Sequence, residues 1–185
     1  MIPARFRRIS RAGNIRALYG MIVTQARTAA FYTGYGVPDT VQGRFDLLVL
    51  HLVLVLHRLA PRSGPPAKAI SGVGQELFDV FCRDLDDNLR EMGVGDLRVP
   101  KEMRRFGEAF YGRQAAYNGA LAAGDGQALE KALARNIFGA TGVDERAARL
   151  GRYARAAAAQ LDATEEGALI GGKVIFPDPE AIVHD

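Results

Sequence analysis

One segment limits the folds open to this chain more than any other, because it is apolar on nearly every side. The longest apolar stretch, Leu47 to Leu56, has ten residues and is interrupted only by His51. That is about half the length needed to cross a bilayer. A helix with apolar residues all round is typical of the buried centre of a helical protein. We therefore expect a central helix over about 40–60, with Asp39 as its N-cap and Gln42 completing a capping box.

The rest of the chain also shows helical rather than strand periodicity. Apolar residues recur at helical spacing over about 15–30, 70–92, 100–123, 127–138 and 144–163. Glycine and proline separate these segments, most densely in the loop 60–67 and the connection 93–100. A length of 185 residues favours one domain. The sequence therefore predicts an all-α, single-domain helical bundle of about six helices with a short irregular C-terminal tail.

The domain boundaries follow from composition and charge. The predicted helical domain covers 13–170, and the tail covers 171–185, with apolar residues at 174–176 that we expect to dock on the body. Residues 1–30 contain six arginines and no acidic residue, whereas the remainder has three more acidic than basic residues. Residues 1–12 are therefore predicted to form a basic arm.

That arm also has an amphipathic pattern. Ile2, Phe6 and Ile9 fall at helical spacing, with arginines around them. Such an arm binds an anionic membrane surface or the phosphates of RNA. The alternative is that it only packs on the body. The predicted membrane or RNA contacts are Arg5, Phe6, Arg8 and Arg11.

Short catalytic and metal-binding motifs are missing from the sequence. It has no P-loop, Rossmann fingerprint, HExxH or GxSxG pattern, and its single cysteine and three histidines form no metal signature. We predict no catalytic residue, no cofactor and no metal. Cys82 lies on the apolar side of the helix 70–92, which indicates a small buried side chain; the alternative is a nucleophile.

Asn14 and Arg16 interrupt the apolar stretch near the N-terminus. The sequence therefore predicts no signal peptide and an intracellular protein.

Three polar residues form a narrow stripe on the central helix. Arg44, His51 and Arg58 recur every seven positions among apolar residues. A stripe of this kind predicts either a partner contact or an internal set of hydrogen bonds. His51 alone also raises the alternative of a metal or haem ligand, but it has no second histidine on its face.

The helix 70–92 has an apolar side and a charged side. The apolar side is formed by Phe78, Phe81, Cys82, Leu85, Leu89 and Met92. Asp84, Asp86, Asp87 and Glu91 are the acidic residues of the other side, interleaved with Arg83 and Arg90. Three readings stay open for this acidic face: solvated ion pairs, a divalent-cation site, or a docking face for a basic partner.

Three long segments carry a resemblance to a known family. They are GVPDTVQGRFDLLVLHLVLVLHRL (36–59), ELFDVFCRDLDDNLREMGVGDLRVPKEM (76–103) and EAFYGRQAAYNGAL (108–121). Together, over 36–121, they resemble the ubiquinol–cytochrome c chaperone family, whose members assist assembly of the cytochrome bc complex. The lack of a long presequence makes this chain resemble a bacterial relative.

The resemblance implies a helical, non-enzymatic assembly chaperone that binds newly made cytochrome b. It also implies a small partner protein and a ribosome contact as further candidates, and no DNA. The expected location is the bacterial cytoplasm, peripheral at the inner face of the cytoplasmic membrane, or the matrix side in a mitochondrion. Partner contacts are predicted at the stripe, the acidic face, Tyr111 and Arg113. Exposed members of Phe106, Phe110, Tyr111 and Tyr117 are expected to offer the client an aromatic patch.

Two other functions remain open at this point. One is a membrane-surface or RNA-binding module acting through the basic arm. The other is a small helical enzyme using Cys82 or the carboxylates.

Overall fold

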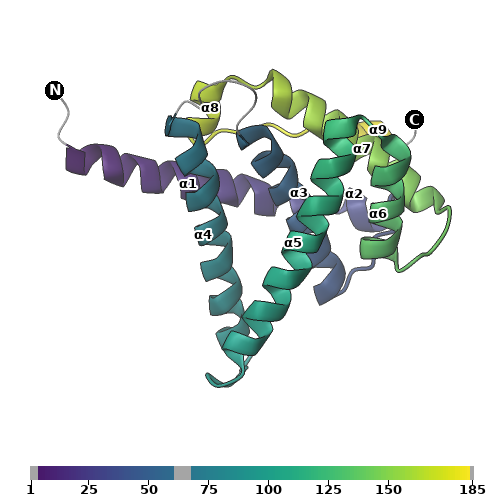
Figure 1. Cartoon of the computed structure of the whole chain (residues 1–185), viewed down its shortest axis with the longest axis horizontal. Coiled ribbons are helices and arrows are strands. Elements are labelled where there is room, and N and C mark those ends of the chain that lie inside the picture. The colour runs from purple at the N-terminus through teal and green to yellow at the C-terminus, as the bar shows by residue number, and fades with distance from the viewer. Residues whose placement is uncertain (1–3, 61–67, 184–185) are drawn as a thin grey trace.

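The chain folds into helices only, over the residues that the structure describes. The computed structural model describes the backbone of residues 4–60 and 68–183, and the side chains of 11–60 and 72–182. Within these ranges there are nine helices and no strand (Figure 1). They are α1 (Ala4–Ala26), α2 (Ala30–Thr33), α3 (Val41–Leu59), α4 (Lys68–Glu91), α5 (Val99–Ala123), α6 (Gly126–Phe138), α7 (Glu145–Ala163), α8 (Glu166–Ile170) and α9 (Pro179–Val183).

The predicted all-α fold is confirmed, and the predicted number of helices is too low. The six expected helices correspond to α1 and α3 to α7, which have 13 residues or more. The helices α2, α8 and α9 have only four or five residues. A single turn shows no periodicity in a sequence, so these were not predicted. The tail that was expected to be irregular contains one helical turn, α9. Most of the predicted loop 60–67 lies outside the described residues.

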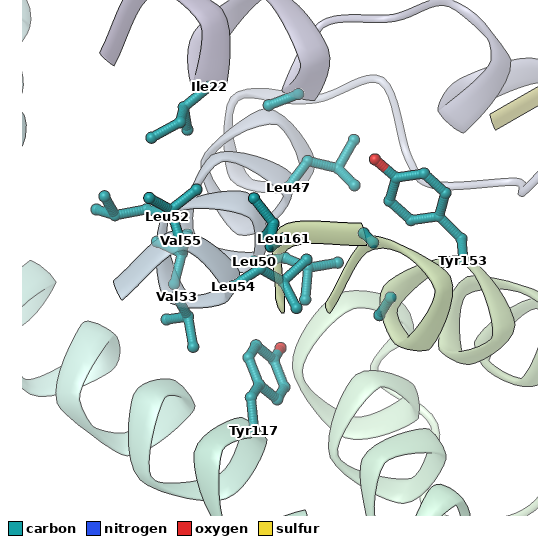
Figure 2. Packing of buried hydrophobic residues seen from close by; sticks show 14 of the residues in the cluster. Ile22, Leu47, Leu50, Leu52, Val53, Leu54, Val55, Tyr117, Tyr153 and Leu161 are labelled. Atoms are coloured by element: carbon teal, nitrogen blue, oxygen red, sulfur yellow. The ribbon is translucent and has the colours of Figure 1, made fainter. Parts of the chain in front are cut away.

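Helix α3 forms the centre of the core, as predicted. Nine of its apolar side chains, from Phe45 to Leu59, are buried, and Ile22, Tyr117, Tyr153 and Leu161 point toward it from α1, α5 and α7 (Figure 2). The helix begins one residue later than expected. The Thr40 side chain accepts a hydrogen bond from the backbone N–H of Gly43, and Asp39 pairs with Arg44 instead of capping. No helix in the described ranges combines the length and the apolar character needed to cross a bilayer.

Helix α1 is continuous where a boundary was expected. Residues 4–12, assigned to the basic arm, run without interruption into the helix that continues to Ala26. The helix ends four residues earlier than the apolar pattern predicts, because the backbone turns at residues 27–29. This turn directs Phe31 and Tyr35 of the following segment into the core, where both side chains are fully buried.

Helices α4 and α5 form a long hairpin whose tip lies far from α6, α7 and α8 (Figure 1). Gly93 ends α4 with a φ of 79°, and Pro100 lies in the first turn of α5, both as predicted. Toward this tip α4 and α5 leave the layer of helices that covers α3 elsewhere. On the apolar side of α4, Leu85 is half-buried, Leu89 is buried and Met92 at the end of the helix is exposed.

The C-terminal segment packs along α1 and α2. Asn14 donates a hydrogen bond to the carbonyl of Ile170, Gln25 donates to that of Pro177, and the Tyr35 hydroxyl donates to that of Pro179. Val174 is buried, as the tail prediction required, whereas Ile175 is exposed. Side chains far apart in the sequence thus fix the path of this segment.

Candidate interaction groove

An open groove lies where the α4–α5 hairpin leaves the body. It has a volume of about 230 Å³ and is formed by the C-terminal halves of α1 and α4 and the N-terminal parts of α3 and α5. Its apolar lining comes from Val23, Ala26, Val41, Phe45, Leu48, Leu85, Leu89, Met92 and Phe106. Its polar lining comes from Arg27, Gln42, Arg44, Asp84 and Asn88.

The groove exposes large apolar side chains to solvent. Val41 is 73% exposed and Met92 is 61% exposed, although Met92 continues the apolar side of α4. Leu48, Leu85 and Phe106 are half-buried along the floor. Exposed apolar groups that line a concave surface and carry a polar rim are typical of an interaction site. A flexible methionine adapts to side chains of different shape.

One rim of the groove is acidic and belongs to α4. The Tyr19 hydroxyl of α1 donates a 2.7 Å hydrogen bond to a carboxylate oxygen of Asp84. Burial raises the pKa of Tyr19, and the hydrogen bond and negative charge of Asp84 raise it further. Tyr19 therefore remains a neutral donor and fixes the Asp84 carboxylate at the edge of the groove.

The opposite rim is basic. Arg44 lies on α3 and pairs with Asp39 at 2.7 Å, which lowers the pKa of that carboxyl. Arg27 at the end of α1 is exposed and makes no ion pair within the described part of the chain. Arg44 and Asp84 come from two separate predicted sets, the stripe and the acidic face, and the fold brings them to one groove.

The rest of the acidic face divides into paired and unpaired carboxylates. Asp86 pairs with Arg90 at 2.7 Å, which also contacts Asp96. Asp87 and Glu91 are exposed and have no hydrogen-bond or ion-pair partner among the described residues. The described residues contain no group of three His, Cys, Asp or Glu side chains that could hold a metal ion. The divalent-cation reading of this face therefore has no support.

His51 lies inside the core and not on a surface. Its side chain is fully buried, with Nδ1 2.8 Å from the carbonyl oxygen of Leu47 and Nε2 2.9 Å from the Tyr153 hydroxyl. A carbonyl only accepts, so Nδ1 carries the proton and Nε2 accepts from Tyr153. Burial lowers the pKa of His51 to about 4. The neutral imidazole has both nitrogens engaged, so the structure supports the internal hydrogen-bonding alternative and leaves no free nitrogen for a ligand role.

The stripe does not form one contact surface. Arg58 donates to the carbonyl oxygens of Leu161 and Thr164 at the end of α7, at 3.0 and 2.9 Å. Cations and donors at a helix C-terminus satisfy its free carbonyls. Since α7 packs over α3, His51 and Arg58 hold these two helices together; His51 is buried, Arg58 is half-buried and Arg44 is exposed.

Tyr111 and Arg113 also have different surroundings. Tyr111 is 58% exposed, and the centre of its ring lies 5.9 Å from that of Phe78, beside another depression between α3, α4 and α5. Arg113 is nearly buried and pairs with Asp46. Among the aromatic residues considered for a client patch, Phe110 and Tyr117 are buried in the core, Phe106 lines the groove, and Tyr111 is exposed.

The predicted membrane or RNA contacts lie at the margin of what the structure describes. The side chains of Arg5, Phe6 and Arg8 are outside the described residues. Arg11 pairs with Glu76 of α4 at 2.8 Å, which attaches this turn of α1 to the body.

Cys82 is half-buried, and burial raises the pKa of its thiol, in agreement with a structural side chain.

Several groove residues were not singled out from the sequence. Met92 had been placed on the apolar side of its helix, and only its late position, next to Gly93, hints that no neighbour covers it. Val41, Leu48 and Arg27 carry no local signal, because the groove depends on how four helices meet.

Comparisons with known proteins agree with this architecture. A crystal structure of the Cbp3 homolog from Brucella abortus is similar, with 38% identity and a TM-score of 0.85 over 98% of this chain and 99% of that chain. A search of curated proteins finds no match. The family model for the ubiquinol–cytochrome c chaperone matches residues 33–176, which extends well beyond the segment 36–121 that carried the resemblance. The chain therefore belongs to the ubiquinol–cytochrome c chaperone family.

Proposed function

We propose that this chain is a non-enzymatic chaperone that binds newly made cytochrome b during assembly of ubiquinol–cytochrome c reductase. The observation that carries the proposal is the family match over residues 33–176. The groove supports this proposal, because its open apolar lining offers binding energy and shielding to an apolar client. The enzyme alternative gains no support from Cys82, which is half-buried with a raised thiol pKa, or from His51, whose two ring nitrogens are both engaged.

The proposed place of action is the inner face of a bacterial cytoplasmic membrane, with the chain bound at the surface. A membrane-protein client emerges there with apolar segments that must be kept from aggregating. A small partner protein is a further proposed component. The alternative of a membrane or RNA module acting through the basic arm has no supporting observation. Arg11, the one arginine of the arm whose side chain the structure describes, is already paired with Glu76.

The proposal is tested by recovering the tagged full-length chain from its host in mild detergent. The eluate is examined by mass spectrometry and by a reduced-minus-oxidised haem spectrum. We expect cytochrome b to be enriched over other membrane proteins of similar abundance, and the haem signal to report the assembly stage. A control chain with Met92→Glu and Leu85→Glu in the groove should recover less. An eluate without cytochrome b, from a host that is making the complex, would overturn the proposal.

A further inference from the structure

We propose that the groove binds the junction between an apolar, membrane-spanning segment and the Lys/Arg-rich segment that flanks it. This inference rests on the proposed function, because it specifies which part of a membrane-protein client the groove takes. The apolar end of the junction lies on the floor of the groove. Its basic residues face Asp84, Asp87 and Glu91.

The apolar half of the argument comes from α4. Its buried side runs through Leu77 and Phe81, which are covered by neighbouring helices. The same side continues through the half-buried Leu85 and the buried Leu89 to Met92, which is 61% exposed to solvent. These side chains form an apolar surface that runs along α4, and Val41 of α3 adds to it from across the groove. A client segment with apolar side chains on one face covers it.

The acidic half comes from the adjoining side of the same helix. Glu91 lies about two turns after Asp84, on the same side of α4, and Asp87 lies between them. Asp87 and Glu91 have no ionic partner among the described residues, and Asp84 has only the neutral Tyr19 hydroxyl. The nearby carbonyls at the C-terminus of α4 add negative potential at this end. Three uncompensated carboxylates beside an apolar groove favour a partner that is apolar and then cationic.

Charge complementarity selects the junction over other occupants. Cytoplasmic flanks of membrane-spanning helices are enriched in Lys and Arg. An apolar segment followed by such a flank matches the floor and the acidic rim at once. An anionic lipid surface or RNA would be repelled by the acidic rim. On the opposite rim Arg44 is neutralised by Asp39, and Arg27 is exposed without a described ion pair. Against this single unpaired cation stand the three carboxylates of α4 that lack an ionic partner among the described residues, so the uncompensated charge beside the groove is negative.

The direct test uses two labelled peptides and fluorescence anisotropy with the full-length chain. Both peptides contain the same eight-residue segment of Leu and Ala, followed by three Lys in one and three Glu in the other. We expect the Lys peptide to bind at least tenfold more tightly at low salt. Raising the salt to about 0.5 M should reduce this ratio, because exposed ion pairs are screened. Equal affinity for the two peptides would overturn the inference.

Matched variants locate the effect on the rim. Asp87→Lys with Glu91→Lys should remove or reverse the preference, whereas Asp79→Lys with Glu108→Lys changes the net charge equally on exposed sites away from the groove and should preserve it. Met92→Gln, which adds no charge, should weaken binding of the Lys peptide by removing apolar contact. Circular dichroism verifies that each variant folds. The inference would be contradicted if the variant with Asp87→Lys and Glu91→Lys kept its preference for the Lys peptide. It would also be contradicted if the control variant lost that preference to the same extent.

Recovery of cytochrome b separates this inference from the proposed function. If the rim variant recovers cytochrome b as well as the unaltered chain does, the junction inference is wrong and the proposed function stands. If the unaltered chain distinguishes the peptides but recovers no cytochrome b, the groove chemistry stands and the proposed client is wrong.

Discussion

Arg113 on α5 and Asp46 on α3 form an ion pair inside the bundle, with 2.7 Å between Nη2 and Oδ1. The two side chains are only 14% and 2% exposed. Gln42 donates a further hydrogen bond to the same carboxylate, and the guanidinium lies 6.0 Å from the centre of the Phe45 ring. The pair therefore fixes α5 against α3 directly behind the groove, where Phe45 is part of the floor.

Removing one partner of this pair should be costly. Arg113→Ala leaves a buried carboxylate with only Gln42 as a donor, and we expect a loss of about 3–5 kcal/mol in the free energy of unfolding. Arg44→Ala removes an exposed pair and should cost less than about 1 kcal/mol. Urea denaturation of both variants measures the difference. If Arg113→Ala were as mild as Arg44→Ala, the pair would not hold α5 in place.

A paired substitution separates the charge effect from the loss of packing. Arg113→Met combined with Asp46→Leu removes both charges and fills similar space. We expect this double variant to be much more stable than Arg113→Ala alone, since no unpaired buried charge remains. Equal destabilisation of the two would point to lost packing as the cause.

His51 should make stability depend on pH in a defined direction. Its pKa in the folded chain is lowered to about 4 by burial, below the usual value of 6.5. The folded state therefore binds fewer protons than the unfolded state between these values. Its contribution is complete above about pH 6.5 and is lost as the pH falls toward 4, by an amount on the order of 3 kcal/mol.

Chemical denaturation at several pH values tests this, with His51→Gln as the comparison. The variant should be less stable at pH 7, because a Gln side chain does not reproduce the rigid ring with which His51 bridges the Leu47 carbonyl and the Tyr153 hydroxyl. Its stability should fall less between pH 6.5 and 4. Burial raises the pKa of Asp46, which acts in the opposite direction and is common to both proteins. Parallel pH profiles for the two proteins would show that His51 does not carry the dependence.

Gly172 should resist substitution because of a close backbone approach. Its φ is 79°, and a Cβ there would lie 2.5 Å from the Asn14 carbonyl oxygen and 2.7 Å from the Asn14 Cα. Gly139 has a φ of 64° but open space around it. Gly139→Ala should cost about 1–2 kcal/mol from backbone strain alone. Gly172→Ala should cost clearly more, because the C-terminal segment must also move away from α1.

Thermal unfolding of the two alanine variants gives the comparison. A cost of 1 kcal/mol corresponds to a decrease of about 2–4 °C in Tm for a chain of this size. Limited proteolysis should release the C-terminal segment earlier in Gly172→Ala than in Gly139→Ala. Similar decreases in Tm would mean that the close approach to Asn14 adds no cost beyond that of placing alanine at a positive φ.

Cys82 should react slowly with thiol reagents in the folded chain. Burial raises the pKa of its thiol, and the negative charge of Asp79 raises it further, so the reactive thiolate is scarce at pH 7. We expect labelling at least tenfold slower than in the urea-unfolded chain. Fast, stoichiometric labelling of the folded chain would revive the hypothesis of an enzyme with a cysteine nucleophile.

The sequence by itself determined the helical architecture, because that information is local. The periodicity of apolar residues and the glycines and prolines between them predicted the six long helices, including the buried centre at α3. Capping chemistry is local too, but Thr40 and Asp39 are adjacent candidates, and the prediction selected the wrong one. The short helices α2, α8 and α9 lacked the length for a period, and tertiary contacts fix them.

Only the tertiary structure decided which polar residues are internal and which are exposed. Arg44, His51 and Arg58 look equivalent in the sequence, yet α7 packs over the last two and leaves the first at the groove. The same holds for Tyr111 and Arg113, which are two residues apart and face solvent and core respectively. The groove itself arises because the α4–α5 hairpin extends past the helices that cover α3, and the relative placement of helices depends on contacts between residues far apart in the chain.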